Sequence, residues 1–159
     1  AGLSPLSLEI ESQAIARSLL GPRDLGTVLI VNFGPEKVGL YVTNKRVVRF
    51  TSTISMSGEM GDKEGLLLQE IKKLYMYWHT LKENIDEPGN KIDHVVLCGE
   101  SFNDATASYL SAHLSTRVSS GNVWTNVFDI NRQVPEISFS DSLRYPASIG
   151  LALFSDTLI

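Results

Sequence analysis

Apolar positions in the first third of the chain change from a helical to an extended spacing. Residues 8–20 have apolar side chains about one turn apart and predict an amphipathic helix, which Gly21-Pro22 should end. The short β-branched run that follows is typical of a strand buried on both faces, and two further strands come after it, with Asn44-Lys45 as the hairpin turn between them. The three expected strands are 27–31, 38–43 and 46–55. This part of the sequence therefore predicts a helix followed by a three-stranded meander.

A single apolar stripe with the period of a helix follows, between about residues 62 and 85. The stripe consists of Leu67, Ile71, Leu74, Trp78, Leu81 and Ile85. Such a stripe can form a coiled-coil seam, but beside several strands it favours one long helix that lies across a sheet. Pro88-Gly89-Asn90 should turn the chain after this helix.

Strand and helix patterns alternate in the remaining residues. In the last helix, Pro146 falls in the first turn, and small residues such as Gly150 should allow close packing. The expected elements are a strand at 92–98, a helix at 104–114, a short strand or extended link at 117–118, a helical turn within 124–130 and a buried helix at 145–154. A meander followed by strand–helix units predicts an α/β fold.

Composition excludes several classes of protein. The 159 residues include 14 basic and 18 acidic side chains, a net charge of −4 that argues against a nucleic-acid-binding protein. No apolar run approaches the roughly 18 residues that a membrane span requires. Cys98 is the only cysteine, which excludes an internal disulfide and a cysteine-based zinc site. With no glycosylation sequon and no signal-peptide pattern, the expected compartment is the cytoplasm.

One strand–turn–helix segment resembles the nucleophile elbow of α/β hydrolases. Gly99-Glu100-Ser101 matches the start of that motif, but Asn103 occupies the position of its last glycine. The only downstream histidine, His113, lies three turns along the same expected helix, roughly 18 Å away at 1.5 Å per residue. A serine–histidine pair must lie within about 3 Å, so a hydrolase is not expected.

Other candidate polar residues have structural interpretations. Trp78 belongs to the helical stripe and is expected in the core, whereas Asp141 and Asp156 suit turns or helix caps. Converging metal ligands are not expected from histidines without i, i+4 spacing, and the three histidines are His79, His94 and His113.

Two glycine-containing turns follow buried strands and are the stronger candidates for a ligand site. Asn32-Phe33-Gly34 leads from the first strand into the hairpin, and Cys98-Gly99-Glu100 leads from the fourth strand into a helix. Backbone N–H groups in such turns can approach an anion closely. Taken singly, each is better explained as a structural turn.

In their order along the chain, these segments resemble the second lobe of the actin-like nucleotide-binding fold of actin, Hsp70 and sugar kinases. In that superfamily an Asp-x-Gly strand begins a meander and supplies the second phosphate loop, and a later strand ending in Gly-Gly opens the helix that supports adenosine. Residues 31–34 and 97–100 occupy these positions. The closer resemblance is to type IV pilus assembly proteins of the PilM type, relatives of FtsA. It covers most of the chain and includes residues 2–11, 14–17, 50–59 and 149–153.

The resemblance implies an α/β, ribonuclease H-like lobe. Its mixed five-stranded sheet should begin with a three-stranded meander and carry helices on both faces. Residues 1–22 would be the linking strand and helix from a first lobe, and residues 23–159 the second lobe, with a helical or inserted part at about 56–90. The first lobe itself is not recognised in this sequence.

Departures from the family pattern fall at the nucleotide site. Asn32 replaces the phosphate-loop aspartate, and an amide lacks the negative charge that a Mg²⁺ site prefers. Residues 34–38 contain no hydroxyl side chain, and Glu100 replaces the second glycine of the adenosine turn. The nucleotide-contacting residues implied by the resemblance are therefore Asn32, Gly34, Gly99 and Glu100, with no catalytic residue and no metal ligand. No cofactor is expected in this chain alone. ATP with Mg²⁺ is expected only in a protein that has both lobes.

The function implied by the resemblance is that of a scaffold in a type IV pilus or related secretion machine. It would lie on the cytoplasmic side of the inner membrane and bind the tail of a PilN-type membrane protein, other machine subunits and the motor ATPase. An oligomer is compatible with this role, and nucleic acid is not an expected partner. An active ATPase or small-molecule kinase of the same superfamily is the first alternative, although the scaffold interpretation favours a protein that is not an enzyme. An unrelated α/β binding module is the second.

Overall fold

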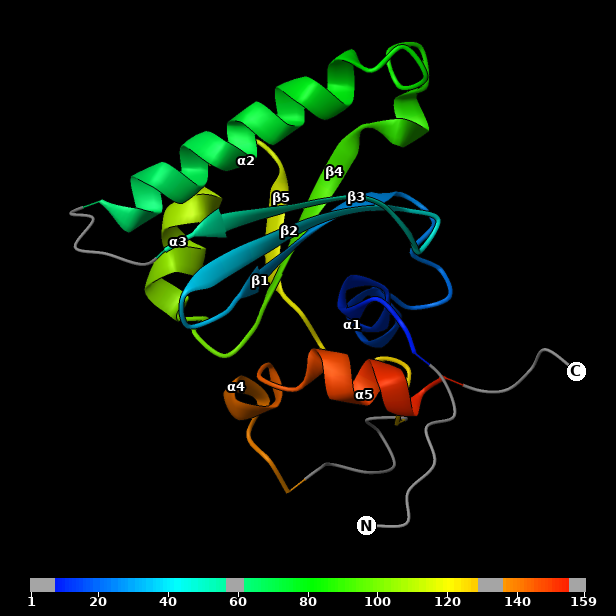
Figure 1. Ribbon diagram of the computed structural model, residues 1–159, viewed down its shortest axis with the longest axis vertical. Helices are drawn as coiled ribbons and strands as arrows, with labels where there is room; N and C mark the ends of the chain where they lie inside the picture. The colour runs from blue at the N-terminus through cyan, green and yellow to red at the C-terminus, as the bar shows by residue number, and fades with distance from the viewer. Residues whose placement is uncertain (1–7, 57–61, 129–135, 155–159) are drawn as a thin grey trace, which may run out of the picture.

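A single mixed sheet forms the centre of the molecule (Figure 1). The computed structural model describes residues 8–56, 62–128 and 136–154. The strands are β1 (Thr27–Phe33), β2 (Lys37–Asn44), β3 (Val47–Ser55), β4 (Ile92–Cys98) and β5 (Arg117–Ser120). They lie in the order β3-β2-β1-β4-β5, with antiparallel pairing in the β1–β2–β3 meander and parallel pairing of β1 with β4 and of β4 with β5. The predicted mixed five-stranded sheet that begins with a meander is confirmed.

Helices cover both faces of this sheet, as predicted (Figure 1). One face carries α2 (Lys63–Thr80) and α3 (Asp104–His113), and the other carries α1 (Glu11–Leu19) and α5 (Pro146–Ala152). A short helix, α4 (Phe139–Ser142), and a 3₁₀ turn, Pro88–Asn90, complete the described elements. No helix among the described residues has the length and apolar character needed to cross a bilayer.

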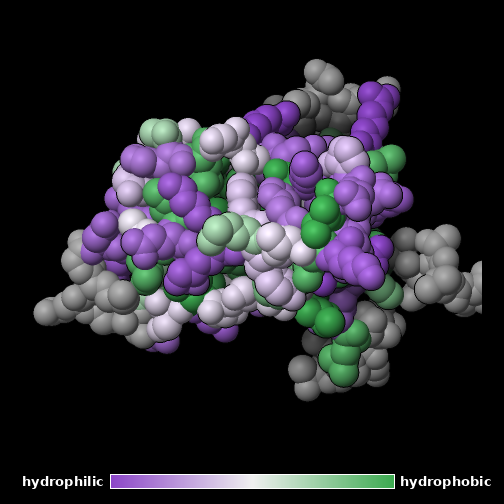
Figure 2. All heavy atoms as spheres, turned by 90° about the horizontal axis from the view of Figure 1, so that it is seen from above, coloured by the Kyte–Doolittle hydropathy of each residue, from purple (hydrophilic) through white to green (hydrophobic). Residues whose placement is uncertain are grey.

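The helix α2 packs across the sheet through the predicted apolar stripe. Its first turn is capped by Asp62, whose carboxylate accepts a hydrogen bond from the N–H of Gly65 at 2.7 Å. Stripe residues from Leu67 to Trp78 are buried against side chains of β1, β2 and β4, so the sheet-packing interpretation is correct and the coiled-coil alternative is wrong. Seen from above, over α2, most of the outer surface is hydrophilic and the hydrophobic patches are separate (Figure 2).

The helix α2 ends earlier than the stripe predicted. It stops at Thr80, and Leu81 has extended backbone angles. The buried Asn84 then turns back to donate its side-chain N–H to the carbonyl oxygen of Trp78 at 2.9 Å, which satisfies one of the last carbonyl groups of the helix. Ile85 is consequently 52% exposed rather than part of the core, and the prediction of a helix to residue 85 is wrong.

The two helices on the other face lie side by side, although α1 is near the start of the chain and α5 near its end (Figure 1). A Cβ atom added to Gly150 would lie 2.5 Å from the carbonyl carbon of Ala14, so only glycine permits this approach. Arg17 joins the same helices by donating to the carbonyl oxygen of Gly150 at 2.9 Å. The predicted close packing by small residues of the last helix is confirmed.

Two local predictions need correction. The turn between β2 and β3 consists of Lys45-Arg46, one residue later than predicted, because Asn44 pairs with Val47 as the last rung of the hairpin. Both turn residues have positive φ angles, 50° and 66°. In addition, α4 was not predicted, because its four residues are too short to show a helical period.

Some predictions fall outside the described residues. These are the linking segment before residue 8, residues 129 and 130 of the expected helical turn, and Asp156. The described part of that turn, residues 123–127, is a series of turns that begins with the N–H of Thr125 donating to the carbonyl oxygen of Asn122.

Candidate functional site

The four residues predicted to contact a nucleotide line one cavity of about 300 Å³. Asn32 and Gly34 come from the end of β1 and the turn after it, and Gly99 and Glu100 follow β4. These segments meet because β1 and β4 are parallel neighbours, with Asn32 opposite Cys98, so both strands end at the same edge of the sheet. Residues of α1 and α5 form the other side of the cavity. The remaining lining residues are Glu11, Ile15, Phe33, Pro35, Lys37, Gly39, Tyr41, Thr53, Arg144, Pro146 and Ala147.

Asn32 is held by two neighbouring side chains. Its Oδ1 accepts a hydrogen bond from the Cys98 thiol at 3.8 Å, and its side chain is hydrogen-bonded to that of Tyr41. Tyr41 reaches Asn32 because Gly39, directly opposite Asn32 on β2, has no side chain and leaves room for the tyrosine hydroxyl. Burial raises the pKa of Tyr41, although its hydrogen bond to Asn32 acts in the opposite direction.

Backbone N–H groups at both turns are used within the fold. The N–H of Gly34 donates to the carbonyl oxygen of Lys37 at 2.9 Å, and the N–H of Gly99 donates to that of Leu143 at the same distance. The N–H of Ser101 donates to the carbonyl oxygen of Phe33, also at 2.9 Å. These three donors therefore hold the turns together, and an anion could reach them only by breaking those bonds.

Gly99 has a structural reason to be glycine. Its φ angle is +112°, which L side chains rarely adopt. A Cβ atom there would lie 2.5 Å from the carbonyl oxygen of Phe33 and 2.7 Å from Oδ1 of Asn32. The glycine lets the end of β4 approach the end of β1, and this approach forms one wall of the cavity.

The charged side chains of the cavity balance one another. Lys37 and Arg144 are basic, and Glu11 and Glu100 are acidic. Arg144 donates to Glu100 at 2.7 Å, in an ion pair of which both members are about half exposed. Such a surface pair contributes roughly 0–1 kcal/mol to stability. The cavity therefore has no net positive charge with which to attract a polyphosphate.

Sequence reasoning did not identify Tyr41, Lys37 or Arg144 as part of this site. Strand period places Gly39 and Tyr41 on the same face of β2, but it does not show which residue of β1 they meet. Arg144 lies far from either turn in the sequence and reaches the cavity through the chain that precedes α5. No local sequence signal indicates that position.

The three histidines have separate local partners. The Nε2 of His79 accepts a hydrogen bond from the N–H of Ile92 at 3.0 Å, and the Nε2 of His94 lies 2.8 Å from the Ser119 hydroxyl. The Nδ1 of His113 lies 2.8 Å from the carbonyl oxygen of Tyr109, four residues earlier in the same helix. Burial lowers the pKa of His79 and of His94. Each histidine thus has its own hydrogen-bond partner, and the described residues contain no group of three or more His, Cys, Asp or Glu side chains placed to hold a metal.

The remaining candidate polar residues also have structural roles. Trp78 is buried, and its indole N–H donates to the carbonyl oxygen of Asn90 at 2.6 Å. Asp141 lies in the first turn of α4, where its N–H donates to the hydroxyl of the cap residue Ser138 at 3.1 Å. The core interpretation of Trp78 is confirmed, whereas Asp141 lies within a helix whose cap residue is Ser138.

Comparison with known proteins gives structural neighbours. No protein-family model matches the chain, and no curated protein matches its sequence. The structure is similar to a chain of the PilM-PilN type IV pilus biogenesis complex, with a TM-score of 0.67 and 18% identity over 96% of this chain and 53% of that chain. A weaker likeness is to the AlfA filament bound to AMPPNP, with a TM-score of 0.48 and 18% identity over 89% of this chain and 40% of that chain. A second weak likeness is to a Bacteroides thetaiotaomicron protein of unknown function with an actin-like ATPase fold, with a TM-score of 0.44 and 8% identity over 68% of this chain and 36% of that chain.

The likeness to the chain from the PilM-PilN complex concerns the fold. This chain spans about half the length of that neighbour. Nearly all of this chain takes part in the superposition, and its mixed sheet and two helical layers are those expected of a PilM-like, actin-like lobe. The predicted fold class is therefore confirmed.

Proposed function

We propose that this chain is part of a scaffold protein of a type IV pilus or related secretion machine, and that it acts by binding other proteins. The observation that carries the proposal is the shared fold, over 96% of the chain, with a chain of the PilM-PilN complex. By this analogy the partner is the cytoplasmic tail of a PilN-type membrane protein, and the protein lies on the cytoplasmic side of the inner membrane. Other machine subunits, including the motor ATPase and further copies of the protein, are the additional partners of this proposal.

The same proposal includes a nucleotide site that is weak or lost. The cavity residues do not fit ATP with Mg²⁺: Asn32 supplies an amide where a metal site prefers a carboxylate, and the N–H groups of Gly34 and Gly99 are already hydrogen-bonded. Balanced charge in the cavity offers no compensation for the charge of a triphosphate. The scaffold role therefore requires no turnover.

Partner binding tests the first part of the proposal. The full-length protein would be titrated with a synthetic peptide of the PilN-type cytoplasmic tail from the same source, and with a scrambled peptide of the same composition as the control. We expect saturable binding of the native tail alone. Equal binding of both peptides, or of neither, would contradict the partner assignment.

Nucleotide binding tests the second part separately. Equilibrium binding of labelled ATP with Mg²⁺ to the full-length protein should show no saturation in the micromolar range and no release of phosphate. Micromolar affinity together with hydrolysis would contradict the weakened site and support an active enzyme, whether or not the PilN-type tail binds.

A further inference from the structure

A second hollow, of about 430 Å³, lies on the α1 side of the sheet and shares no residue with the cavity described above. It is bounded by α1, by the chain that follows α5, by the β2–β3 turn and by the loop after β5. Its lining residues are Arg17, Arg46, Asn126, Leu153 and Phe154. Two guanidinium groups thus border one hollow, next to an aromatic ring.

Arg17 is already neutralised by its neighbours. Both of its terminal nitrogens bond to the carboxylate of Glu9, one of them at 2.7 Å, and one also donates to the carbonyl oxygen of Gly150. The guanidinium carbon lies 5.1 Å from the centre of the Phe154 ring. Arg17 is therefore held in place at the edge of the hollow, and its charge is already neutralised by Glu9.

Arg46 is in the opposite situation. Among the described residues its side chain makes no hydrogen bond and no ion pair, and its Nε atom is buried without a partner. A buried guanidinium N–H that lacks an acceptor is costly, because it has given up water without gaining a protein partner. The group that satisfies Arg46 has to be an acceptor, and an anionic oxygen also neutralises its charge.

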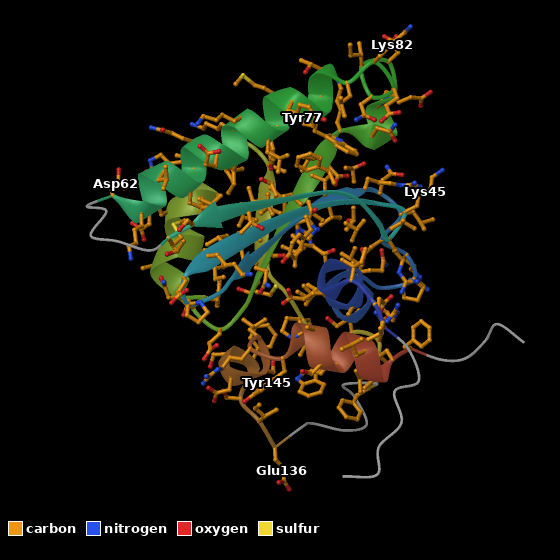
Figure 3. The ribbon with its side chains drawn as sticks, in the orientation of Figure 1. Lys45, Asp62, Tyr77, Lys82, Glu136 and Tyr145 are labelled. Atoms are coloured by element: carbon orange, nitrogen blue, oxygen red, sulfur yellow. The ribbon has the colours of Figure 1, made fainter. Side chains whose placement is uncertain are left out.

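The backbone at Arg46 indicates that its side chain matters. Lys45 and Arg46 form a two-residue hairpin turn with φ angles of 50° and 66°, where Asn-Gly would fit without strain. Gln13 of α1 fixes this turn: its Nε2 donates to the carbonyl oxygen of Arg46 at 3.1 Å, and its Oε1 accepts the N–H of Val48 at 3.0 Å. Lys45 projects from the same end of the sheet (Figure 3). An Asn-Gly turn would relieve this backbone strain. Strain that is retained in spite of this is typical of a functional position.

We propose that Arg46 is the centre of a carboxylate-binding site. In this site the Nε–H and a terminal N–H of Arg46 donate side by side to the two oxygens of one carboxylate, while Leu153 and Phe154 contact the carbon atoms that bear it. The source of this carboxylate is an acidic segment of a partner protein, whose negative charge complements the unpaired charge of Arg46.

The test uses nuclear magnetic resonance of the whole ¹⁵N-labelled chain, in which each arginine Nε–H gives its own signal. The Arg46 signal is assigned by its loss in Arg46→Lys, which keeps the charge but removes the paired donors. Arg46→Gln removes the charge as well, and Arg23→Gln is the matched control because Arg23 is exposed and lies outside the hollow. Thermal unfolding of each variant confirms that it folds.

One result supports the proposal. A signal that moves saturably on addition of succinate, at constant ionic strength, identifies an external carboxylate, and the binding should weaken at least tenfold in Arg46→Gln and remain unchanged in Arg23→Gln. An Arg46 signal that matches free arginine and does not respond to succinate would overturn the proposal.

Discussion

Gly99 is the residue of the candidate cavity that tolerates least change. Its positive φ angle and its contact with the ends of β1 leave no room for a methyl group. We expect Gly99→Ala to lower the free energy of unfolding by about 2–3 kcal/mol, measured by urea denaturation. Gly89→Ala is the matched control, because an added Cβ there meets no atom within 4 Å. An equal effect at both positions would contradict the structural role of Gly99.

Cys98 makes stability depend on pH. Burial raises the pKa of its thiol, and the charge of Glu11 acts in the same direction. Because the folded pKa exceeds the unfolded one, this stabilisation is complete below the ordinary thiol pKa of about 8.5 and is lost as the pH rises above it. Between pH 8 and 9.5 the free energy of unfolding should fall by up to about 1.4 kcal/mol per pH unit, and by less in Cys98→Ala. Equal slopes in the two proteins would show that the thiol is not responsible.

The candidate cavity shows which residue positions a sequence can reveal. The buried strand patterns indicated the two turns, but Asn32, Gly34, Gly99 and Glu100 were named as one site only through the family resemblance. The structure shows that the turns meet because β1 and β4 are parallel neighbours. Tyr41 was not predicted, because its place depends on the register of β1 with β2. The pattern of β2 does not specify which residue of β1 lies opposite Gly39.

At the scale of elements, the β2–β3 turn offers a direct test of strain. Replacing Lys45-Arg46 by Asn-Gly should raise the free energy of unfolding by about 1–2 kcal/mol, because both new residues adopt positive φ angles readily. The same variant should lose carboxylate binding if Arg46 is the binding residue. Thermal unfolding measures the first effect, and Lys82→Asn, at an exposed site after α2, controls for loss of a surface charge. A variant no more stable than the natural chain would contradict the strain argument.

Element boundaries were less predictable than element order. The central strands β1, β2 and β4 were found because each is a short apolar run, and the sheet buries most of their residues, whereas β3 is largely exposed. The end of α2 was missed because Leu81 and Ile85 continue the helical spacing of the sequence. In the structure the side chain of Asn84, which lies beyond the end of the helix, donates to the carbonyl oxygen of Trp78 and so caps the last turn. Only the three-dimensional position of Asn84 distinguishes these cases.

At the scale of the whole molecule, the contact between α1 and α5 joins distant parts of the chain. Replacing a helical glycine by alanine usually stabilises a helix by about 1 kcal/mol. Gly150→Ala should instead lower the free energy of unfolding by about 2–4 kcal/mol, because the added methyl group meets the backbone of Ala14. Ser148→Ala, at an exposed position of the same helix, should change it by less than about 0.5 kcal/mol. Stabilisation by Gly150→Ala, measured by urea denaturation, would contradict the observed packing.

The contact between α1 and α5 also determines how this fold would carry mechanical load. The described chain enters beside α1 and leaves beside α5, and the guanidinium of Arg17 bridges Glu9 and Gly150 at that point. Tension applied through these two places pulls the helices apart and reaches the Arg17 bridge before any strand. The hydrogen bonds of the sheet bear no load until that contact has opened. In a machine that transmits force between subunits, the α1–α5 contact would yield first, and the sheet with its cavity would stay intact.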